Sequence, residues 1–426
     1  MSGGIDRRGL LAGLVATPFA AGLAGCARRS DGLDFWAMGN EAAALPALLG
    51  KIAAPLARGL TVQPLPWSSA HEKLLTGFAG GSLPTLSQIG NSWVAELAAI
   101  GAIEPVPAQY EGLLVDQFAG VLDTNCIAGR TWAVPWYVDT RLQFYRKDLF
   151  AQAGYAAPPE RWADWKASLH KVKALSGAGN YAILMPVNEY EHLTGLALSA
   201  GATMLDAQGS RGAFRDERFV TALAFYKSLI DEKLAPLASA TQISNVWNEF
   251  ARGFFAVYPS GPWTIGDMQT RLPPGFADKW GTAPNPGPDG IGSAAPGGSS
   301  LVVFRGTREP ARGWEIIDRL LTPEAQVELQ QMTGDLPARK SAWTDAGLAD
   351  APHTAPFLRQ LEYARPVPKV PEWERVVSEM QVVAERMLRG EFTVTAAAAE
   401  MDQRADRILT KRRWMLDRKA ESGAAP

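Results

Sequence analysis

The first 26 residues place the strongest constraint on how the rest of this chain can fold. A short polar stretch with Arg7 and Arg8 precedes Gly9 to Leu23, a run without charge that consists mainly of Leu, Ala, Gly, Val and Phe. Small residues and Cys26 follow. A positive segment, a short apolar run and small residues before a cleavage site are typical of an export signal. The run is too short to span a hydrocarbon core of about 30 Å, so we expect no permanent transmembrane helix here.

Two short motifs within this segment resemble known export signals. Leu23-Ala24-Gly25-Cys26 resembles the lipobox of bacterial lipoproteins, in which the Cys becomes a lipidated N-terminus. The pair Arg7-Arg8 before Gly9-Leu10-Leu11 resembles a twin-arginine signal, which Asp6 and Gly9 fit only loosely. We expect residues 1–25 to be removed, Cys26 to carry lipid and residues 26–32 to form a linker. The alternative is a cytosolic protein with an apolar N-terminal helix. Neither the Sec nor the Tat route is singled out, nor is the inner or the outer membrane.

The remaining chain must be stabilised by its core alone. Cys126 is the only cysteine after Cys26, so no disulfide can form within the mature chain, even in an oxidising compartment. About 400 residues suggest two domains. A 47% apolar composition and a net charge of −2 are typical of a globular protein without the basic excess that nucleic acid requires. The 14 Trp residues suit a core, and they also supply flat apolar faces for binding.

The order of the predicted elements indicates an α/β fold. Residues 33–37 and 60–65 have strand patterns, and residues 41–56 between them form a helix rich in Ala and Leu. This strand–helix–strand opening predicts a parallel sheet. Thr322-Pro323 is a helix start and Gly334 a helix stop. Further predicted elements are a strand at 86–89, helices at 71–78, 93–100, 162–175, 219–230, 374–388 and 395–411, and a loop at 281–300.

Motifs for catalysis are absent from the sequence. There is no Gly-x-Ser-x-Gly elbow, no phosphate-binding loop and no His-Glu-x-x-His helix. The four histidines are scattered without ligand spacing, so we expect neither a metal site nor a cofactor. A glycosidase needs only two carboxylates, which sequence spacing does not reveal. Enzymatic activity is therefore disfavoured rather than excluded.

Four segments together resemble the extracellular solute-binding proteins of bacterial ABC importers, in the sugar-binding family that includes maltose- and trehalose-binding proteins. The most specific segment is Ala133–Thr140, which continues into Phe144–Phe150. Thr85 and the bulky Phe255–Tyr258 depart from the family pattern. The resemblance implies a type II periplasmic-binding-protein fold, in which crossing strands join two discontinuous α/β lobes around a ligand cleft. The four segments are 66–93, 133–165, 250–263 and 297–339.

The resemblance also implies a division of the chain. We expect residues 33–139 and 280–321 to form the N-terminal lobe, and residues 140–279 and 322–426 to form the C-terminal lobe. The segment Asp139 to Leu142 is the predicted first crossing, because a strand pattern gives way there to the helical Lys147–Phe150.

Carboxylates, amides, Arg and flat aromatic side chains suit a sugar, because sugars present both hydroxyls and apolar C–H faces. Glu41 and Asp139 have alternative roles as a helix cap and as a partner of Arg141. Arg339 has an alternative partner in Asp335, and Trp136 and Tyr137 can be strand core. Trp67 and His71 are further candidates. By resemblance, the ligand-binding candidates are Glu41, Asn91, Trp93, Asp139, Trp263, Gly297, Gly298 and Arg339, and Trp136 and Tyr137 of the most specific segment are added to them. Asn188 and Glu189 are candidates because they fall on a predicted strand-end loop after the apolar residues 183–185.

The implied function is binding without chemistry. We expect a monomeric, exported protein at the periplasmic or extracellular face, held by lipid on Cys26 as its only membrane contact. It would close on a di- or oligosaccharide of the maltose or trehalose type and deliver it to the ABC permease. One alternative is a different solute, such as a glycerol phosphodiester or a polyamine. Arg339 in the cleft would argue against a polyamine. Another alternative is a surface glycan-processing lipoprotein.

Overall fold

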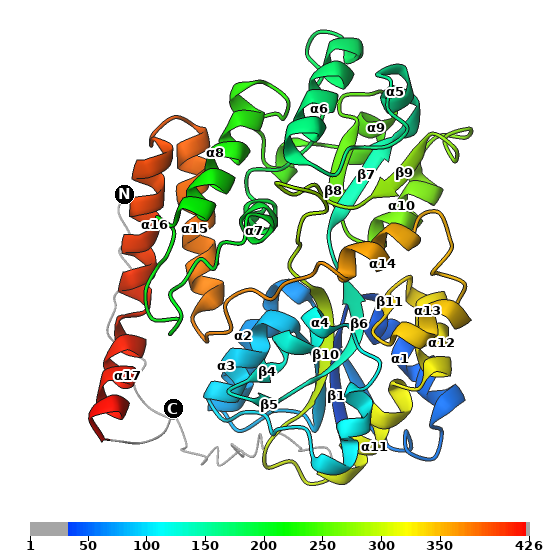
Figure 1. Ribbon diagram of the computed structural model, residues 1–426. Helices are drawn as coiled ribbons and strands as arrows, with labels where there is room; N and C mark the ends of the chain where they lie inside the picture. The colour runs from blue at the N-terminus through cyan, green and yellow to red at the C-terminus, as the bar shows by residue number, and fades with distance from the viewer. Residues whose placement is uncertain (1–32, 423–426) are drawn as a thin grey trace, which may run out of the picture.

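The computed structural model describes residues 33–422 and consists of two lobes, one above the other in Figure 1. The predicted export signal and Cys26 lie outside the described residues. Each lobe combines a β-sheet with helices packed on it, so the predicted α/β class with two lobes is confirmed.

The lower lobe of Figure 1, here called the first lobe, is built on a six-stranded sheet of order β11-β6-β10-β3-β1-β2. β1 runs parallel to β2 and β3, as the predicted strand–helix–strand opening requires. β10 runs antiparallel to both β3 and β6. The strands are β1 (Leu33–Met38), β2 (Leu60–Leu65), β3 (Leu86–Gly90), β6 (Val134–Asp139), β10 (Gly297–Val303) and β11 (Leu336–Pro337).

The helices of the first lobe cover this sheet with apolar faces. In α1 (Gly39–Ile52), Leu45, Leu48 and Leu49 are fully buried at three- and four-residue spacing and pack in the same cluster as Phe35 of β1. α1 also packs against α12. The other helices are α2 (Trp67–Ala79), α3 (Val94–Ala99), α4 (Ala119–Thr124), α11 (Pro310–Leu320), α12 (Pro323–Thr333) and α13 (Lys340–Asp345).

The upper or second lobe has a smaller sheet and more helix (Figure 1). Its antiparallel sheet of order β8-β7-β9 comprises β7 (Leu142–Arg146), β8 (Val257–Ser260) and β9 (Trp280–Ala283). The helices are α5 (Lys147–Gln152), α6 (Trp162–Ser176), α7 (Tyr190–Ser199), α8 (Glu217–Asp231), α9 (Val246–Ala251), α10 (Trp263–Arg271), α14 (Ala355–Leu361), α15 (Trp373–Leu388), α16 (Val394–Ile408) and α17 (Thr410–Ser422).

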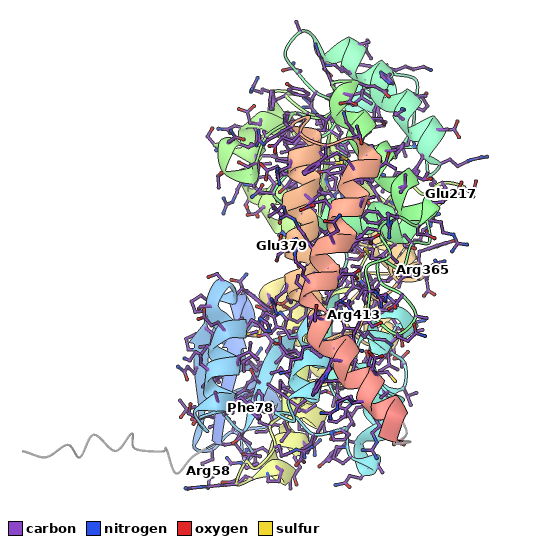
Figure 2. All side chains as sticks on the ribbon, turned by 90° about the vertical axis from the view of Figure 1, so that its left-hand side faces the viewer. Arg58, Phe78, Glu217, Arg365, Glu379 and Arg413 are labelled. Carbon is purple, nitrogen blue, oxygen red and sulfur yellow. The ribbon has the colours of Figure 1, made fainter. Side chains whose placement is uncertain are left out.

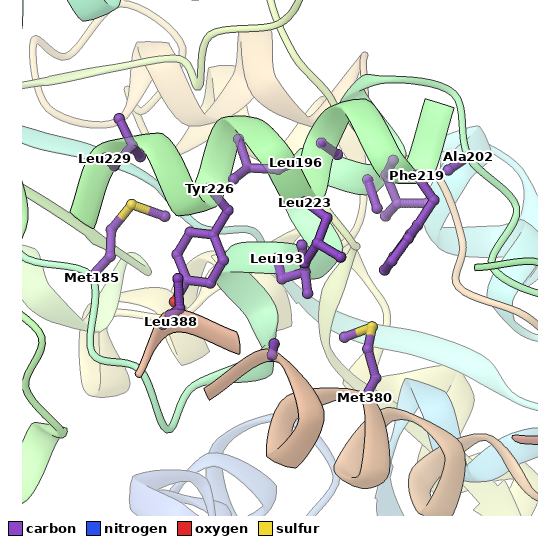
Figure 3. Close-up of a cluster of buried hydrophobic side chains, with 14 of the residues drawn as sticks. Met185, Leu193, Leu196, Ala202, Phe219, Leu223, Tyr226, Leu229, Met380 and Leu388 are labelled. Atoms are coloured by element: carbon purple, nitrogen blue, oxygen red, sulfur yellow. The ribbon is translucent and has the colours of Figure 1, made fainter. Parts of the chain in front are cut away.

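The centre of the second lobe is a block of packed helices (Figure 3). Leu193 of α7 and Leu223 and Tyr226 of α8 are buried together with Met380 and Leu388 of α15. This packing fixes α7, so the N-terminus of α7 has a defined position at the cleft.

The chain passes from one sheet to the other within two residues. β6 ends at Asp139 in the larger sheet, and β7 begins at Leu142 in the smaller sheet. Thr140 and Arg141 therefore lie between the two sheets, as predicted for the first crossing.

The later lobe boundaries differ from those predicted. β9 was expected in the first lobe, but Trp280 pairs with Arg146 of β7 and stacks on His353, with ring centroids 3.8 Å apart. Conversely, β11 pairs with β6, so residues 322–345 lie with the first lobe rather than the second. A pattern of short strands shows where strands occur but not with which sheet each one pairs. We place residues 33–139 and 297–345 in the first lobe, and residues 142–283 and 355–422 in the second.

Candidate functional site

A pocket of ≈ 830 Å³ lies between the two lobes. Its volume falls within the range of about 300–1,000 Å³ that small-molecule sites occupy. The first lobe contributes residues at the ends of β1, β3 and β6 and at the start of β10. The second lobe contributes the first residues of α7, α10 and α15. Ligand sites in α/β sheets lie outside the carboxyl ends of strands, which is the geometry seen here.

Glu41 is held at the pocket by a buried amide. Gln88 of β3 accepts a hydrogen bond from the Met38 backbone N–H at 2.7 Å. Its Nε2 donates to Glu41 at 3.4 Å and to the Tyr137 hydroxyl at 3.3 Å. Glu41 is only 4% exposed, so its position depends on these polar neighbours. The predicted alternative, a helix-capping role, is not seen, because the cap of α1 is Met38 and makes no side-chain bond.

Asn91 links β3 to β10 at the pocket wall. Its Nδ2 donates to the Gly297 carbonyl at 2.8 Å, and its Oδ1 accepts from Ser300 at 2.7 Å. Trp93 follows it, and its ring packs edge-on against Trp67 with centroids 5.7 Å apart. These two indoles form an aromatic wall on the first-lobe side of the pocket.

Asp139 and Arg141 flank the crossing segment, and both line the pocket. The Arg141 guanidinium donates to Glu189 at 2.9 Å and to Glu191 at 3.1 Å, both in the second lobe. It also lies 5.8 Å from the centroid of the Trp263 ring. The charge of Arg141 is therefore already paired with two carboxylates of the second lobe, and no hydrogen bond joins Arg141 to Asp139.

Trp263 presents its indole to the pocket from the start of α10. It is 50% exposed, whereas Trp165 and Trp373, which line the same pocket, are 3% exposed. The residue was predicted at a turn after a strand, and it follows β8 by two residues at the first position of a helix. An exposed Trp at a pocket wall offers a free face for a ligand.

Glycines lie beneath the side chains of the site and allow their close approach. A Cβ at Gly297 would lie 1.9 Å from an Asp139 oxygen, and a Cβ at Gly261 would lie 2.0 Å from the Trp263 ring. Gly298 has a φ of +88°, and a Cβ there would meet the Tyr137 carbonyl at 2.3 Å. Gly297 and Gly298 therefore contribute the room they leave, in addition to the Gly297 carbonyl that holds Asn91 and the Gly298 amide that bonds to Asp139.

The structure brings together eight of the twelve predicted site residues. Whether they bind a ligand stays a prediction. Those that line the pocket are Glu41, Asn91, Trp93, Tyr137, Asp139, Trp263, Gly297 and Gly298.

The other four predicted residues lie elsewhere. Trp136 is fully buried in the first-lobe core, because neighbouring strand residues point to opposite faces and Tyr137 takes the pocket side. Asn188 accepts from the Ala240 N–H at 2.8 Å in a second-lobe loop. Glu189 holds Arg141 from outside the pocket. Arg339 donates to the Leu321 carbonyl at 3.0 Å, so its predicted place in the cleft is wrong.

Several pocket residues were missed by sequence reasoning. Arg141 was considered only as a partner for Asp139, and Asp335 only as a partner for Arg339. No motif marks the other missed residues, because they start helices or follow loops that meet only in the folded chain. The missed residues include Asn40, Trp165, Tyr190, Glu191, Trp373 and Glu374, whereas the further candidate Trp67 does line the pocket.

The charge of the pocket is mainly negative. Two cations line it, Arg141 and Lys369, and Lys369 is paired with Asp123 at 2.7 Å. Burial lowers the pKa of His192 to about 3, with a further contribution from Arg141, so this ring is neutral near pH 7. The pocket carboxyl groups are Glu41, Asp139, Glu191, Asp335 and Glu374. Among residues 33–422, no group of three or more His, Cys, Asp or Glu is placed to hold a metal ion.

Two of these carboxyl groups have raised pKa values. Burial raises the pKa of Asp139 from 3.8 to about 6, although Arg141 and the Gly298 amide oppose the shift. Burial also raises the pKa of Asp335, and the nearby Glu41 raises it further. An incoming hydroxyl donor would stabilise the ionised forms of these groups.

Comparison with known proteins identifies what the chain resembles. Residues 57–356 match the family model described as bacterial extracellular solute-binding protein. The sugar-binding protein MalE from Xanthomonas citri is 43% identical, with a TM-score of 0.87 over 90% of this chain and 99% of that one. Diacetylchitobiose binding protein DasA of Streptomyces coelicolor is 22% identical over 74% of this chain and 73% of its own length. UgpB from Mycobacterium tuberculosis, solved in complex with glycerophosphocholine, is 23% identical and shares the fold, with a TM-score of 0.74 over 90% of this chain and 99% of that one.

The glycines beneath the site predict a test of its geometry. Gly297→Ala and Gly261→Ala should displace Asp139 and Trp263, because each new Cβ would overlap them. Neither glycine has a positive φ, so alanine fits the backbone itself. We expect the Kd for the tightest ligand of a sugar panel to rise about tenfold or more, measured by calorimetry. Gly266→Ala in α10 is the matched control, since nothing lies within 4 Å of its Cβ. An unchanged Kd in both site variants would contradict this geometry.

The raised pKa of Asp139 predicts a pH dependence of stability. Because the folded pKa, about 6, exceeds the ordinary value of 3.8, the folded state holds this proton more tightly than the unfolded state. The contribution of Asp139 to the free energy of unfolding therefore falls as pH rises from about 4 to about 6. Asp139→Asn should remove that fall, so its melting temperature should decline less over this window than that of the wild type. Asp289→Asn, at a carboxylate whose side chain is 95% exposed, is the control and should follow the wild-type profile.

Proposed function

This chain belongs to the family of bacterial extracellular solute-binding proteins, and on that premise we propose that its interlobe pocket binds a neutral di- or oligosaccharide for an ABC importer. The observation that carries the proposal is the exposed indole of Trp263 in the same pocket as five carboxyl groups, of which Glu41 is buried. Carboxylates accept hydrogen bonds from sugar hydroxyls, and an indole packs on the apolar C–H face. An α-linked disaccharide such as maltose or trehalose is the ligand we propose first.

The charges of the pocket favour a neutral ligand over a glycerol phosphodiester. A phosphate group requires an available cation or a set of free backbone N–H groups. Arg141 is already bonded to Glu189 and Glu191, and Lys369 is paired with Asp123. The pocket carboxylates would in addition repel an anion.

A polyamine is the alternative ligand that the acidic pocket favours. Arg339 was expected in the cleft as the group that disfavours a cation, but it lies outside the pocket. Arg141 does not take that role, because its charge is paired with Glu189 and Glu191. The preference for a sugar over a polyamine therefore rests on the aromatic walls, which suit the apolar C–H faces of a sugar.

Binding would be coupled to movement of the lobes. Three connections join the lobes, of which the two residues between β6 and β7 are the shortest. Ligand contacts from both walls would be complete only when the lobes are close. A ligand that binds the closed state better shifts the population toward it. The closed, loaded protein would then deliver its sugar to the permease, without chemical change to the ligand.

Trp263→Ala tests this assignment. A stacked indole contributes roughly 2–3 kcal/mol, so its loss should raise the Kd about thirty- to a hundredfold in calorimetry with the tightest sugar of a panel. The melting temperature should change little, because half of the side chain is already exposed. Trp414→Ala is the control, since Trp414 is 55% exposed and lies outside the pocket. Unchanged affinity would refute the assignment, and turnover of the sugar by the purified protein would favour the glycan-processing alternative.

We also propose that Cys26 carries lipid and that residues 1–25 are removed, although both lie outside the described residues. The support is the apolar run before Leu-Ala-Gly-Cys, together with the extracellular character of the family. Mass spectrometry of the native protein from the membrane fraction should show a lipid-modified Cys26 at the N-terminus. Cys26→Ser should release the protein from that fraction. An intact Met1 terminus would end this proposal.

A further inference from the structure

The C-terminal helix α17 exposes a face that the sugar site does not use. Lys411, Trp414, Met415 and Arg418 are spaced at i, i+3, i+4 and i+7, so they lie on one side of the helix. Trp414 is 55% exposed and Met415 is 41% exposed, and both cations are exposed as well. We call these four residues the α17 face.

The rest of α17 holds this face outward. Arg413 donates to the Ser210 carbonyl at 2.8 Å and to the Asp406 carbonyl at 2.7 Å. Arg412 reaches the Gln208 carbonyl at 3.4 Å. Figure 2 views the molecule from the side that carries α16 and α17 and labels Arg413 next to these helices. These bonds fix the helix, so the exposure of the α17 face is a property of the fold.

The chemistry of the α17 face suits the boundary between lipid headgroups and acyl chains. The Arg418 guanidinium lies 4.8 Å from the centroid of the Trp414 ring. Lys and Arg can lay their apolar stems on a bilayer while their charges stay among the headgroups, and Trp prefers the same depth. The face carries two positive charges although the whole chain has a net charge of −2. Basic and aromatic residues on one exposed helix face are the pattern of interfacial helices.

We propose that the α17 face binds the surface of an anionic lipid bilayer. A second copy of the chain would bring a like-charged face, which disfavours self-association. α17 lies outside the sugar pocket, so this contact is independent of the proposed ligand. It is a membrane contact besides the lipid on Cys26, which was expected to be the only one. None of the helices in residues 33–422 is long and apolar enough to cross a bilayer, so the contact is one of the surface.

The position of α17 is consistent with this contact. α17 extends from α16 toward the lower end of the molecule in Figure 1, to the level of the first lobe and away from the cleft. β1 begins at the same end of that lobe, because its other end leads into Gly39 and Glu41 at the pocket. A lipid at Cys26 and the α17 face would therefore act on one membrane. Two membrane contacts that are each weak can together hold a protein stably on the membrane.

The experiment uses the chain from Ala27, which lacks the lipid and retains every described helix and strand. We expect this protein to float with vesicles of phosphatidylethanolamine and phosphatidylglycerol, and not with vesicles of phosphatidylcholine alone. Raised salt should weaken the binding, since it screens the two cations. Absence of binding to the anionic vesicles at low salt would overturn the proposal.

Three variants test which residues make the contact. The double variant Lys411→Gln, Arg418→Gln should lower the vesicle partition coefficient at least tenfold, because each cation near an anionic surface raises that coefficient about fivefold. Trp414→Ala should lower the partition coefficient several-fold, although it leaves the charge of the α17 face unchanged. The matched control is Lys171→Gln with Leu175→Ala on α6, where Leu175 is 52% exposed and follows Lys171 by four residues.

The outcomes separate this proposal from the sugar site. All variants should keep the wild-type melting temperature and the wild-type Kd for sugar. Equal binding by the α17 variants and the control would overturn the proposal, because the contact would lie elsewhere. A dimer in sedimentation that Trp414→Ala abolishes would overturn it too, by assigning the face to a second copy. Loss of sugar binding with vesicle binding intact would count against the proposed function alone.

Discussion

The continuous passage of the chain from β6 into β7 is the constraint on which the rest of the structure depends. β6 is paired on both sides in the six-stranded sheet, and β7 is central in the three-stranded sheet. Each strand is therefore fixed by its own lobe, and the two residues between them determine where the lobes meet. Asp139 and Arg141 at this point line the pocket, so the site is built around the joint.

The pocket combines buried polar groups with exposed aromatic ones, and the two depend on different supports. Glu41 and Asn91 are positioned by amide and hydroxyl partners on neighbouring strands. Trp263 and Asp139 instead depend on the missing side chains of Gly261 and Gly297. Polar groups that are held in place before the ligand arrives lose little entropy on binding. The glycines add the room that lets large side chains lie against the main chain.

The ionised carboxylates of the pocket are energetically unfavourable in the empty protein, and a bound ligand can stabilise them. Burial raises the pKa values of Asp139 and Asp335, so ionised carboxylates in the empty pocket are poorly stabilised. A ligand with many hydroxyl donors supplies the missing hydrogen bonds, whereas an anion adds repulsion. The electrostatics disfavour an anion, and the aromatic walls favour a ligand with apolar C–H faces, which together are consistent with the polyhydroxylated class that we propose. The basic α17 face lies away from this pocket, and its proposed contact with an anionic bilayer does not depend on the ligand.

The sequence by itself determined the features that depend on local chemistry. The alternation of apolar residues in 33–37 and 60–65 predicted β1 and β2, Thr322-Pro323 predicted the start of α12, and Gly261-Pro262 placed Trp263 just after a strand. Family resemblance added the two lobes and eight of the pocket residues.

Only the tertiary structure decided which elements share a sheet and which side chains meet. β9 joined β7 and β11 joined β6, because strand pairing depends on partners far along the chain. Trp136 and Tyr137 are adjacent, yet one is core and the other lines the pocket, since the face of a strand that meets the cleft is set by packing. Arg141, Glu191 and Asp335 come from three separate segments of the chain, and Arg339 is turned away by its bond to the Leu321 carbonyl. Their convergence is a property of the folded chain, because no local interaction specifies contacts between the two lobes.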